Sequence, residues 1–564
     1  MADMPNCAAK RAVKAPRRIT VTPSASDSPL LIKALLRTAL QGAPEQEIVY
    51  RDRVRYDYTE FDRRVRRLAN GLSTLGIGPG DTVGVMDWDS HRYLECYFGI
   101  PSMGAVLHTV NVRLSPEQIL YTINHAEDDA LLVHPDFLPL VEEIWPRIER
   151  PCTIVLLAED VVPESGLPVA ALYETMLAEA SVDFVFPDFD ENSCATTFYT
   201  TGTTGLQPKG VYFSHRQIVL HTLAASAALS ANSGNQRLHR GDVYMPVTPM
   251  FHVHAWGVPF VATMLGLKQV YPGRYAPDTL LNLLATEKVT FSHCVPTLLQ
   301  MLVGHPASAA VDLRGLKMVI GGSALSTGLA QAALARGIDV FTGYGMSETC
   351  PIVTLAQLPP ALMASSPEQQ LEIRTRAGWP LPLVDLRIVD PAMDDVSRDG
   401  GTTGEVVLRA PWLTQGYLKD AAGSETLWQG GYLHTGDVGR LDRWGQLEIT
   451  DRIKDVIKTG GEWVSSIQIE DLISKHPAVG ETAVIGVPDG KWGERPVALV
   501  VPSRGCSVDE GSIQAHLQTF SDQGLISKWA IPARVIVTET LDKTSVGKLD
   551  KKRIRDRLAR NDFS

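Results

Sequence analysis

A run of hydroxylated residues and glycines that ends in a lysine is the segment best suited to chemistry. It reads Tyr199-Thr-Thr-Gly-Thr-Thr-Gly-Leu-Gln-Pro-Lys-Gly210. Glycines let a backbone approach an oxyanion closely, hydroxyls donate hydrogen bonds, and a lysine adds positive charge. We interpret this run as a phosphate-handling loop, with a flexible turn as the competing interpretation. Its candidate phosphate ligands are Thr200, Thr201, Gly202, Thr203, Thr204, Gly205 and Lys209.

The spacing in this loop differs from that of P-loop nucleotidases. Their loop needs Gly-Lys-Ser/Thr after four spacer residues, and no such triplet follows here. The pattern therefore disfavours a P-loop nucleotidase or a kinase.

The elements that position this loop follow an alternating pattern. Residues 58–75 have a helical period, whereas 81–86 and 130–134 are short β-branched runs separated by Gly, Pro and Asp. Such alternation predicts an α/β fold with parallel sheets covered by helices. At 564 residues and 44% hydrophobic content, the chain is expected to form two or more domains.

The pattern changes after about residue 377. Shorter strand-like runs at 386–389, 404–409 and 445–450 predict a β-rich subdomain that closes the large domain. Beyond a charged stretch at 451–455, a compact α+β domain is expected, with strands at 482–487 and 497–501. The predicted divisions are a disordered leader at 1–28, a large N-terminal domain at 29–451 and a small C-terminal domain at 452–564.

Charge and cysteine content limit the partners and the compartment. The net charge of -11 argues against nucleic acid as a partner, because binding to phosphate backbones favours a basic surface. Seven scattered cysteines without a C-x-x-C pair favour reduced thiols and the cytoplasm over a disulfide framework. The basic N-terminal stretch leaves a transit peptide to an organelle such as the mitochondrial matrix as the less favoured alternative. No apolar run is long enough for a transmembrane segment.

Five separated segments, in this order, resemble those of the acyl-adenylate-forming superfamily, which includes the acyl-CoA synthetases. The resemblance covers nearly the whole chain. It implies a reaction in which a carboxylate attacks the α-phosphate of ATP to give acyl-AMP and pyrophosphate, after which coenzyme A displaces AMP. The segments are Tyr199 to Gly210, Thr342-Gly-Tyr-Gly-Met-Ser-Glu-Thr349, Tyr432-Leu-His-Thr-Gly-Asp-Val438, 451–463 and Lys543-Thr-Ser-Val-Gly-Lys-Leu-Asp550.

The resemblance assigns roles residue by residue. Lys548 matches the family's catalytic lysine, and Lys209 and Glu348 are the other residues assigned to catalysis. Glu348 with Thr200 matches the family's magnesium-holding pair. Lys454 matches the hinge about which a mobile C-terminal domain rotates, and it is also assigned to ATP or AMP. Without the family resemblance, we would interpret Glu348 as a solvated turn residue, Asp437 as a turn cap and Lys548 as part of a solvated charge run. The remaining residues assigned to ATP or AMP are Gly343, Tyr344, Gly345, Ser347, Asp437, Arg452, Lys458 and Trp463.

Three further segments, at residues 250–257, 292–297 and 321–324, predict the pocket for the acid. In similar fatty acyl-CoA synthetases a tryptophan gates an acyl tunnel, and Trp256 occupies that position, although an aromatic residue there is also typical of a plain core. His254 stands where many long-chain members carry Asn. His254 and His293 either line a shorter, more polar pocket or lie behind the pocket with their hydrogen bonds satisfied. The predicted acyl-binding residues are His252, Val253, His254, Trp256, Val295, Gly322, Ser323 and Ala324.

These observations predict an ATP-dependent, Mg²⁺-dependent acyl-CoA synthetase for a monocarboxylic acid, with a medium- or long-chain fatty acid as the expected substrate. The alternatives are an aryl or methylthio-alkanoate CoA ligase, or an adenylating enzyme with an acceptor other than coenzyme A. The resemblance allows a homodimer. Chain length is not decided by the sequence, because each buried methylene contributes only about 0.8 kcal/mol.

Overall fold

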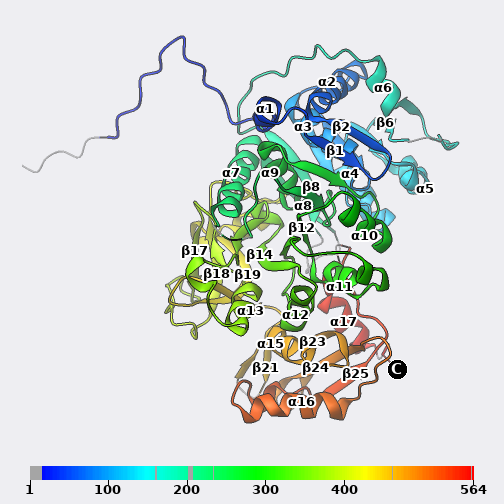
Figure 1. Ribbon diagram of the computed structural model, residues 1–564. Coiled ribbons are helices and arrows are strands. Elements are labelled where there is room, and N and C mark those ends of the chain that lie inside the picture. Colours follow the sequence, from blue (N-terminus) through cyan, green and yellow to red (C-terminus); the bar gives the residue numbers. More distant parts are fainter. Residues whose placement is uncertain are drawn as a thin grey trace, which may run out of the picture.

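Two large, mainly parallel sheets form the framework of the N-terminal part of the chain (Figure 1). The structure, a computed structural model, describes residues 15–158, 162–200, 207–232, 234, 236–459, 462–545, 547–560, 562 and 563. Residues 15–28 contain no helix or strand and are exposed.

The first large sheet has seven strands in the order β7-β6-β5-β3-β4-β8-β9. Its neighbours pair in parallel except β8 with β9, which form an antiparallel edge. Apolar runs such as that of β5 are buried on both faces, as expected for parallel strands covered by helices. The strands are β3 (Thr82–Met86), β4 (Val106–Thr109), β5 (Ala130–Val133), β6 (Thr153–Leu156), β7 (Val169–Leu172), β8 (Cys194–Thr200) and β9 (Lys209–Ser214).

The second large sheet has nine strands in the order β16-β15-β14-β13-β12-β10-β11-β1-β2. Its central strands are parallel, and both edges are antiparallel. The strands are β1 (Glu47–Tyr50), β2 (Val54–Asp57), β10 (Val243–Pro246), β11 (Lys268–Tyr271), β12 (Phe291–Cys294), β13 (Lys317–Ile320), β14 (Asp339–Gly345), β15 (Ile352–Leu355) and β16 (Trp379–Pro380).

Helices cover these sheets and begin at recognisable caps. The Asp57 side chain, for example, accepts a hydrogen bond from the backbone of Glu60 at the start of α2. The helices of this part are α1 (Lys33–Gly42), α2 (Tyr58–Thr74), α3 (His91–Ser102), α4 (Pro116–Ala126), α5 (Leu138–Ile144), α6 (Tyr173–Glu179), α7 (His215–Ala231), α8 (Val253–Trp256), α9 (Val258–Leu265), α10 (Pro277–Thr286), α11 (Pro296–Gly304), α12 (Thr327–Ala335) and α13 (Pro367–Thr375).

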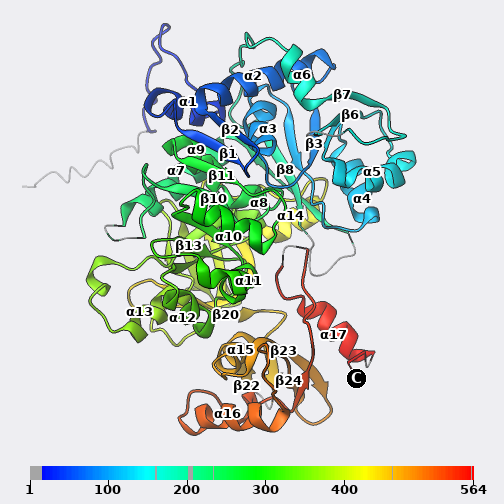
Figure 2. The same cartoon turned by 45° about the vertical axis from the view of Figure 1, so that its right-hand side comes forward.

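A four-stranded antiparallel sheet follows, in the order β17-β18-β19-β20. The next sheet has the order β22-β21-β24-β23, with β25 paired to β24, and lies with its helices at the far end of the molecule (Figures 1 and 2). Figure 2 shows the segment before α17 running back toward the large sheets. The elements are β17 (Asp385–Val389), β18 (Gly404–Arg409), α14 (Ala421–Leu427), β19 (Leu433–Leu441), β20 (Leu447–Arg452), β21 (Ile457–Thr459), β22 (Glu462–Val464), α15 (Ser466–Ser474), β23 (Val479–Asp489), β24 (Gly493–Pro502), α16 (Glu510–Asp522), β25 (Arg534–Val537) and α17 (Lys551–Ala559).

The predicted α/β class is confirmed, as are the β-rich sheet after residue 377 and the small C-terminal α+β unit. The strand expected at 445–450 begins later, at Leu447, because Gly445 has a φ of +77° and lies in the turn before it. Within the described residues, no helix combines the length and apolar character needed to cross a bilayer.

A buried carboxylate ties α2, α3 and α6 together. Glu95 is fully buried and accepts hydrogen bonds from the Arg64 guanidinium at 2.7 Å and from the hydroxyls of Tyr56 at 2.6 Å and Tyr173 at 2.7 Å. Burial by itself raises the pKa of Glu95, but the Arg64 charge and its hydrogen bond more than offset this, so its pKa lies below the ordinary value.

We expect Arg64→Ala to lower the melting temperature strongly, because it leaves a buried carboxylate without its cation, at a cost of about 3–5 kcal/mol. Arg63→Ala is the matched control, since the Arg63 side chain is 56% exposed and its one ion pair within the described part of the chain is with Glu60 at 3.4 Å. Calorimetry on both variants measures the difference. Equal melting temperatures for the two variants would contradict the structural importance of the Arg64–Glu95 pair.

Candidate functional site

Segments that are far apart in the sequence meet around one small cavity between the nine-stranded sheet and the C-terminal unit. Its volume is about 20 Å³, little more than one water molecule requires. Among the described residues, Lys548 is the one lysine or arginine side chain in its lining. The lining residues are His252, Val253, Trp256, Gly321, Gly322, Gly343, Tyr344, Gly345, Met346, Ser347, Pro351, Ile352 and Lys548.

Lys548 enters this cavity from the turn before α17. Burial lowers the pKa of Lys548 to about 8, and the charge of Arg452 acts in the same direction. The carboxylates of Asp437 and Glu348 oppose this effect. The ammonium group is therefore held in a place where burial disfavours its charge and nearby carboxylates favour it.

Gly322 provides the passage for the Lys548 side chain. A Cβ atom at position 322 would lie 2.9 Å from Cε of Lys548 and 3.1 Å from Cγ1 of Val295. Gly322 also has a φ of +81°, a conformation that side chains disfavour. The predicted acyl-binding residues Gly322 and Val295 thus lie beside the lysine, whereas Ser323 and Ala324 are exposed and absent from the cavity lining.

Glu348 lies in a short 3₁₀ turn, Ser347–Thr349, directly after β14. It is 6% exposed, and its Oε1 accepts a hydrogen bond from the Tyr417 hydroxyl at 2.8 Å. Burial raises the pKa of Glu348, while the Tyr417 hydrogen bond and the charges of Lys548 and Lys209 act against that rise. The same Tyr417 ring lies 4.2 Å from the Lys209 ammonium, a cation–π distance.

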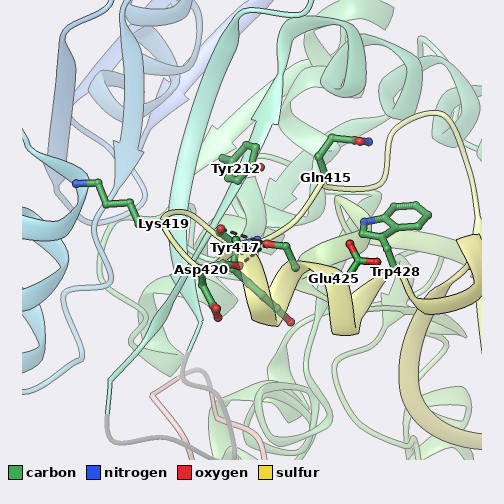
Figure 3. Close-up of a pocket in the computed structure, with 9 residues that line it drawn as sticks. Tyr212, Gln415, Tyr417, Lys419, Asp420, Glu425 and Trp428 are labelled. Atoms are coloured by element: carbon green, nitrogen blue, oxygen red, sulfur yellow. Dashed lines mark hydrogen bonds between the residues drawn. The ribbon is translucent and has the colours of Figure 1, made fainter.

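Lys209 begins β9 and pairs with Thr200, the last residue of β8. The predicted phosphate ligands Thr201, Gly202, Thr203, Thr204 and Gly205 lie outside the described residues. Lys209 is 3.8 Å from the carboxylate of Asp420, and Asp420 lines an open cavity of about 710 Å³ (Figure 3). This second cavity is lined by Tyr212, Gln415, Tyr417, Lys419, Asp420, Ala421, Ser424, Glu425 and Trp428.

Asp437 connects the tyrosine and the arginine that were predicted to hold the nucleoside. Its Oδ2 accepts a hydrogen bond from the Tyr344 hydroxyl at 2.8 Å, and its Oδ1 lies 3.2 Å from Nε of Arg452. Asp437 is 6% exposed, whereas the Arg452 side chain is 46% exposed. The Tyr344 ring therefore enters the lining of the first cavity with its hydroxyl fixed.

The chain passes from the four-stranded sheet to the C-terminal sheet between β20 and β21. Lys454 lies in that connection and is exposed. Lys458 and Trp463 lie opposite each other on β21 and β22, with the ammonium 5.2 Å from the indole ring. The two glycines between these strands, 460 and 461, lie outside the described residues.

The segment that carries Trp256 is a left-handed turn. Val253, His254, Ala255 and Trp256 have φ values between 46° and 59°, and Gly257 follows at 72°. Left-handed conformation costs about 1–2 kcal/mol per L-residue, and clusters of such residues mark functional sites. Trp256 is 5% exposed and packs on the His293 ring at 5.0 Å between centroids.

The two histidines that the sequence left open have different surroundings. His293 is buried and hydrogen-bonded to the Tyr244 hydroxyl at 2.8 Å and to the Thr248 hydroxyl at 3.0 Å. His254 is buried outside the cavity lining, and neither ring nitrogen has a hydrogen-bond partner among the described residues. Its ring contacts aromatic side chains, and burial lowers the pKa of His254 to about 3. The aromatic neighbours are Tyr97, Phe198, Phe213 and Phe260.

Several residues of the site were missed by sequence reasoning. Tyr417 follows a glycine in a stretch without a recognisable period, so nothing in the sequence relates it to Glu348, 69 residues earlier. Met346 lies inside the Gly-Met-Ser-Glu motif but was not singled out, and Pro351 and Ile352 follow the motif closely. Their proximity to the motif was the available signal. Within the described residues, no group of three or more His, Cys, Asp or Glu side chains is arranged to hold a metal ion.

Comparisons with known proteins agree with this arrangement. Residues 36–418 match the family described as AMP-binding enzyme, and residues 468–548 match the AMP-binding enzyme C-terminal domain. A long-chain-fatty-acid–CoA ligase from Thermus thermophilus is 42% identical over 505 residues, covering 89% of this chain and 90% of that protein. A 3-methylmercaptopropionyl-CoA ligase from Ruegeria lacuscaerulensis is 38% identical over 544 residues, covering 94% and 97%.

A solved structure shares the fold over nearly the whole chain. The crystal structure of an anthranilate CoA ligase in complex with anthranoyl-AMP superposes with a TM-score of 0.83, covering 95% of this chain and 99% of that one. Because the two sequences are 23% identical, this similarity establishes the fold alone.

If Lys548 has the catalytic role predicted from the sequence, we expect Gly322→Ala to slow acyl-adenylate formation about 100-fold. Its Cβ would displace the Lys548 side chain, and a shift of about 1 Å in a catalytic group has an effect of that size. Gly315→Ala is the matched control, since Gly315 has a similar φ of +84° but a Cβ there would meet no atom within 4 Å. Pyrophosphate release without a thiol acceptor measures the rate. Equal effects of the two substitutions would show that backbone strain alone is responsible.

Proposed function

The chain belongs to the AMP-binding enzyme family, and on that premise we propose that it activates an aliphatic monocarboxylic acid of medium or longer chain. It is an AMP-forming acid–thiol ligase. In the first half reaction a carboxylate oxygen bonds to the α-phosphorus of ATP and pyrophosphate leaves. In the second, the thiol sulfur of coenzyme A bonds to the acyl carbon, AMP leaves with the bonding electrons, and the thiol proton passes to solvent.

The observation that carries the proposal is the position of Lys548 in the small cavity, beside Gly322 and Tyr344. A carboxylate that approaches a triphosphate brings like charges together, so a cation is needed where they meet. We assign this role to Lys548. Lys209, which begins the strand after the Thr- and Gly-rich loop, is assigned to the phosphates at the leaving end.

Nucleoside recognition is assigned to the residues around Asp437. A carboxylate that only accepts hydrogen bonds suits the two ribose hydroxyls, and the exposed Arg452 guanidinium beside it offers donors. Tyr344 offers a ring face for adenine, and the adjoining lining residues Gly343, Gly345 and Ser347 are assigned to the nucleotide with it.

Glu348 and Thr200 are proposed to hold Mg²⁺ together with the phosphates of ATP. Mg²⁺ is usually bound by one or two carboxylates and substrate phosphates rather than by a cage of protein ligands. Glu348 supplies one buried carboxylate, which fits that requirement. The Tyr417 hydroxyl donates a hydrogen bond to one of its two oxygens, and the other oxygen is the proposed ligand. The metal ion would neutralise charge that develops on the phosphates.

We propose that the unit from residue 452 onward moves relative to residues 29–451 between the half reactions. Lys454, exposed in the connection between β20 and β21, is the proposed hinge. Rotation there would withdraw Lys548 and bring Lys458 and Trp463 toward the site. The cytoplasm and a homodimeric assembly, both expected from the sequence, stay predictions.

The charge of the cavity favours an acid with one carboxylate. Lys548 is the single lysine or arginine in the lining as far as the structure describes it. Burial lowers the pKa of His252 to about 3, and the charges of Lys548 and Arg113 act in the same direction. His252 is therefore neutral at physiological pH, and a second carboxylate would meet no second cation among the described residues of the lining, since Arg113 lies outside it. The 38% identity to a 3-methylmercaptopropionyl-CoA ligase supports a short thioether acid as the second candidate.

Chain length is proposed to depend on Trp256. The cavity of about 20 Å³ is too small for an acyl chain, and Trp256 packs against Gly321, where a Cβ would lie 3.0 Å from the indole. A swing of this side chain would open space beyond it. The left-handed turn that carries Trp256 gives the segment a strained backbone, which favours such a rearrangement.

The proposal is tested with a panel of acids, comprising saturated acids of increasing length, 3-methylmercaptopropionate, benzoate and a dicarboxylate. AMP, pyrophosphate and acyl-CoA are quantified with and without coenzyme A. We expect the highest kcat/KM with an aliphatic monocarboxylate and one acyl-CoA for each AMP. AMP release that does not consume coenzyme A would instead indicate another acceptor, and a preference for the dicarboxylate would contradict the charge argument.

Trp256→Ala is expected to reduce discrimination among acid lengths while the dependence on ATP concentration changes little. A tryptophan that is only part of the core would behave differently, because truncation then costs about 3–5 kcal/mol and lowers activity with every acid alike. Trp412→Ala supplies that comparison, since Trp412 is fully buried away from the cavity lining. The gate is refuted if Trp256→Ala lowers the melting temperature as Trp412→Ala does and leaves the acid profile unchanged.

The pH dependence of acyl-adenylate formation is expected to report Lys548. Its pKa of about 8 means that the ammonium loses its proton, and with it the charge that the reaction needs, as the pH rises through that value. We expect kcat/KM for ATP to fall above about pH 8 in the wild type. Lys548→Arg should be slower but should lack this decline, because a guanidinium stays charged. Measurement without coenzyme A keeps thiol ionisation out of the profile, and an identical decline in both proteins would assign it to another group.

A further inference from the structure

The turn that carries Lys548 is closed by its own hydrogen bonds. Lys543 and Leu549 form an antiparallel bridge, and the Thr544 amide donates to the Lys548 carbonyl at 2.7 Å. The amide of Gly547 donates to the Thr544 carbonyl at 2.9 Å, and the Lys548 amide donates to the Thr544 hydroxyl at 3.2 Å. Because these bonds lie within the turn, they fix its shape but not its place in the molecule.

Two side chains of the large N-terminal part hold this turn from outside. The Asn111 amide nitrogen donates to the Ser545 hydroxyl at 3.0 Å, and the Thr297 hydroxyl donates to the Gly547 carbonyl at 3.0 Å. Ser545 lies three residues before Lys548, and Gly547 lies directly before it. Asn111 and Ser545 are 434 residues apart in the sequence, and Thr297 and Gly547 are 250 residues apart.

Each of these side chains is itself fixed by a different sheet. Asn111 follows β4 of the seven-stranded sheet, is 7% exposed, and accepts a hydrogen bond from the Arg113 amide at 3.1 Å. Thr297 lies in the first turn of α11, which follows β12 of the nine-stranded sheet. A turn held at both points has little freedom to shift along either sheet.

Other contacts across the same boundary are less well suited to this role. Arg113 donates to the Ser545 carbonyl at 3.3 Å, but its side chain is exposed. Gln300 contacts the carbonyl of Gly480 and Thr327 contacts Asp471, both remote in sequence from the turn. Those contacts orient the C-terminal unit as a whole, whereas the Asn111 and Thr297 contacts act on the backbone and side chain next to Lys548.

We propose that Asn111 and Thr297 are positioning residues for acyl-adenylate formation, which hold the 543–549 turn so that Lys548 reaches its place beside Gly322. The inference rests on the proposed function, in which Lys548 serves the first half reaction. Neither residue is required once acyl-AMP has formed, because the turn then leaves the site.

The test measures the two half reactions separately in Asn111→Ala, Thr297→Val and Ser545→Ala. Valine keeps the shape of threonine without its hydroxyl, and Ser545→Ala removes the Asn111 contact from the side of the turn. We expect each variant to slow pyrophosphate release without coenzyme A about 2–10-fold, the effect of one neutral hydrogen bond. Formation of acyl-CoA from supplied acyl-AMP and coenzyme A should stay at the wild-type rate.

Double variants test whether these substitutions act through the Asn111–Ser545 hydrogen bond and through Lys548. Ser545→Ala should add nothing in the Asn111→Ala background, since both remove the same hydrogen bond. Neither Asn111→Ala nor Thr297→Val should further slow the residual adenylation of Lys548→Ala, because these residues act through the lysine. Thr286→Val, which removes an exposed hydroxyl from α10, is the matched control and should be without effect.

Equal slowing of both half reactions, no slowing at all, or additive effects in the Lys548→Ala background would each overturn the inference. If a variant has a lower melting temperature and loses activity equally in both half reactions, that result also overturns the inference. Failure of the proposed function is distinct, since the wild type itself would then release no pyrophosphate with any acid of the panel.

Discussion

Burial disfavours the charged form of Lys548 and lowers its pKa, and the carboxylates of Asp437 and Glu348 partly offset this effect. Because these carboxylates belong to β19 and to the turn after β14, whereas the lysine belongs to the C-terminal unit, the charged site exists only when the two parts are docked. An ammonium without nearby carboxylates would lose its proton or return to water. The passage at Gly322, the preformed turn and the interdomain hydrogen bonds all serve to satisfy this condition.

The same cavity contains a second unfavourable feature, the left-handed backbone from Val253 to Trp256. Such a conformation persists only where the surrounding structure holds it. Here the side chains are buried on all sides, with His254 enclosed by aromatic rings and Trp256 packed on His293. Strain in the backbone and a buried imidazole without a hydrogen-bond partner among the described residues therefore occur together, in a segment that borders the cavity.

The sequence was sufficient to predict elements with a strong local period and residues inside motifs. The helix over 58–75 and the strand at 404–409 appear at the expected places because side-chain periodicity decides them locally. The left-handed turn could not be predicted, since valine, histidine, alanine and tryptophan all disfavour it and tertiary packing imposes it. Tyr417, Asn111 and Thr297 were missed for a related reason. Their partners are distant in the chain, and only the folded sheets bring them together.

The strength of the contacts around the turn bears on how the two half reactions follow each other. Two neutral hydrogen bonds contribute about 1–3 kcal/mol together, enough to favour the docked turn several-fold to about a hundredfold. A charged, bidentate pair in their place would be roughly twice as strong per bond and would retain the turn after acyl-AMP had formed. The second half reaction would then wait for that pair to open. The turn is held mainly through an amide, two hydroxyls and a carbonyl, and its one charged contact, from the exposed Arg113 to the Ser545 carbonyl, is monodentate and longer at 3.3 Å. Such contacts can form and break in every cycle, while the charge that the chemistry needs is supplied by Lys548.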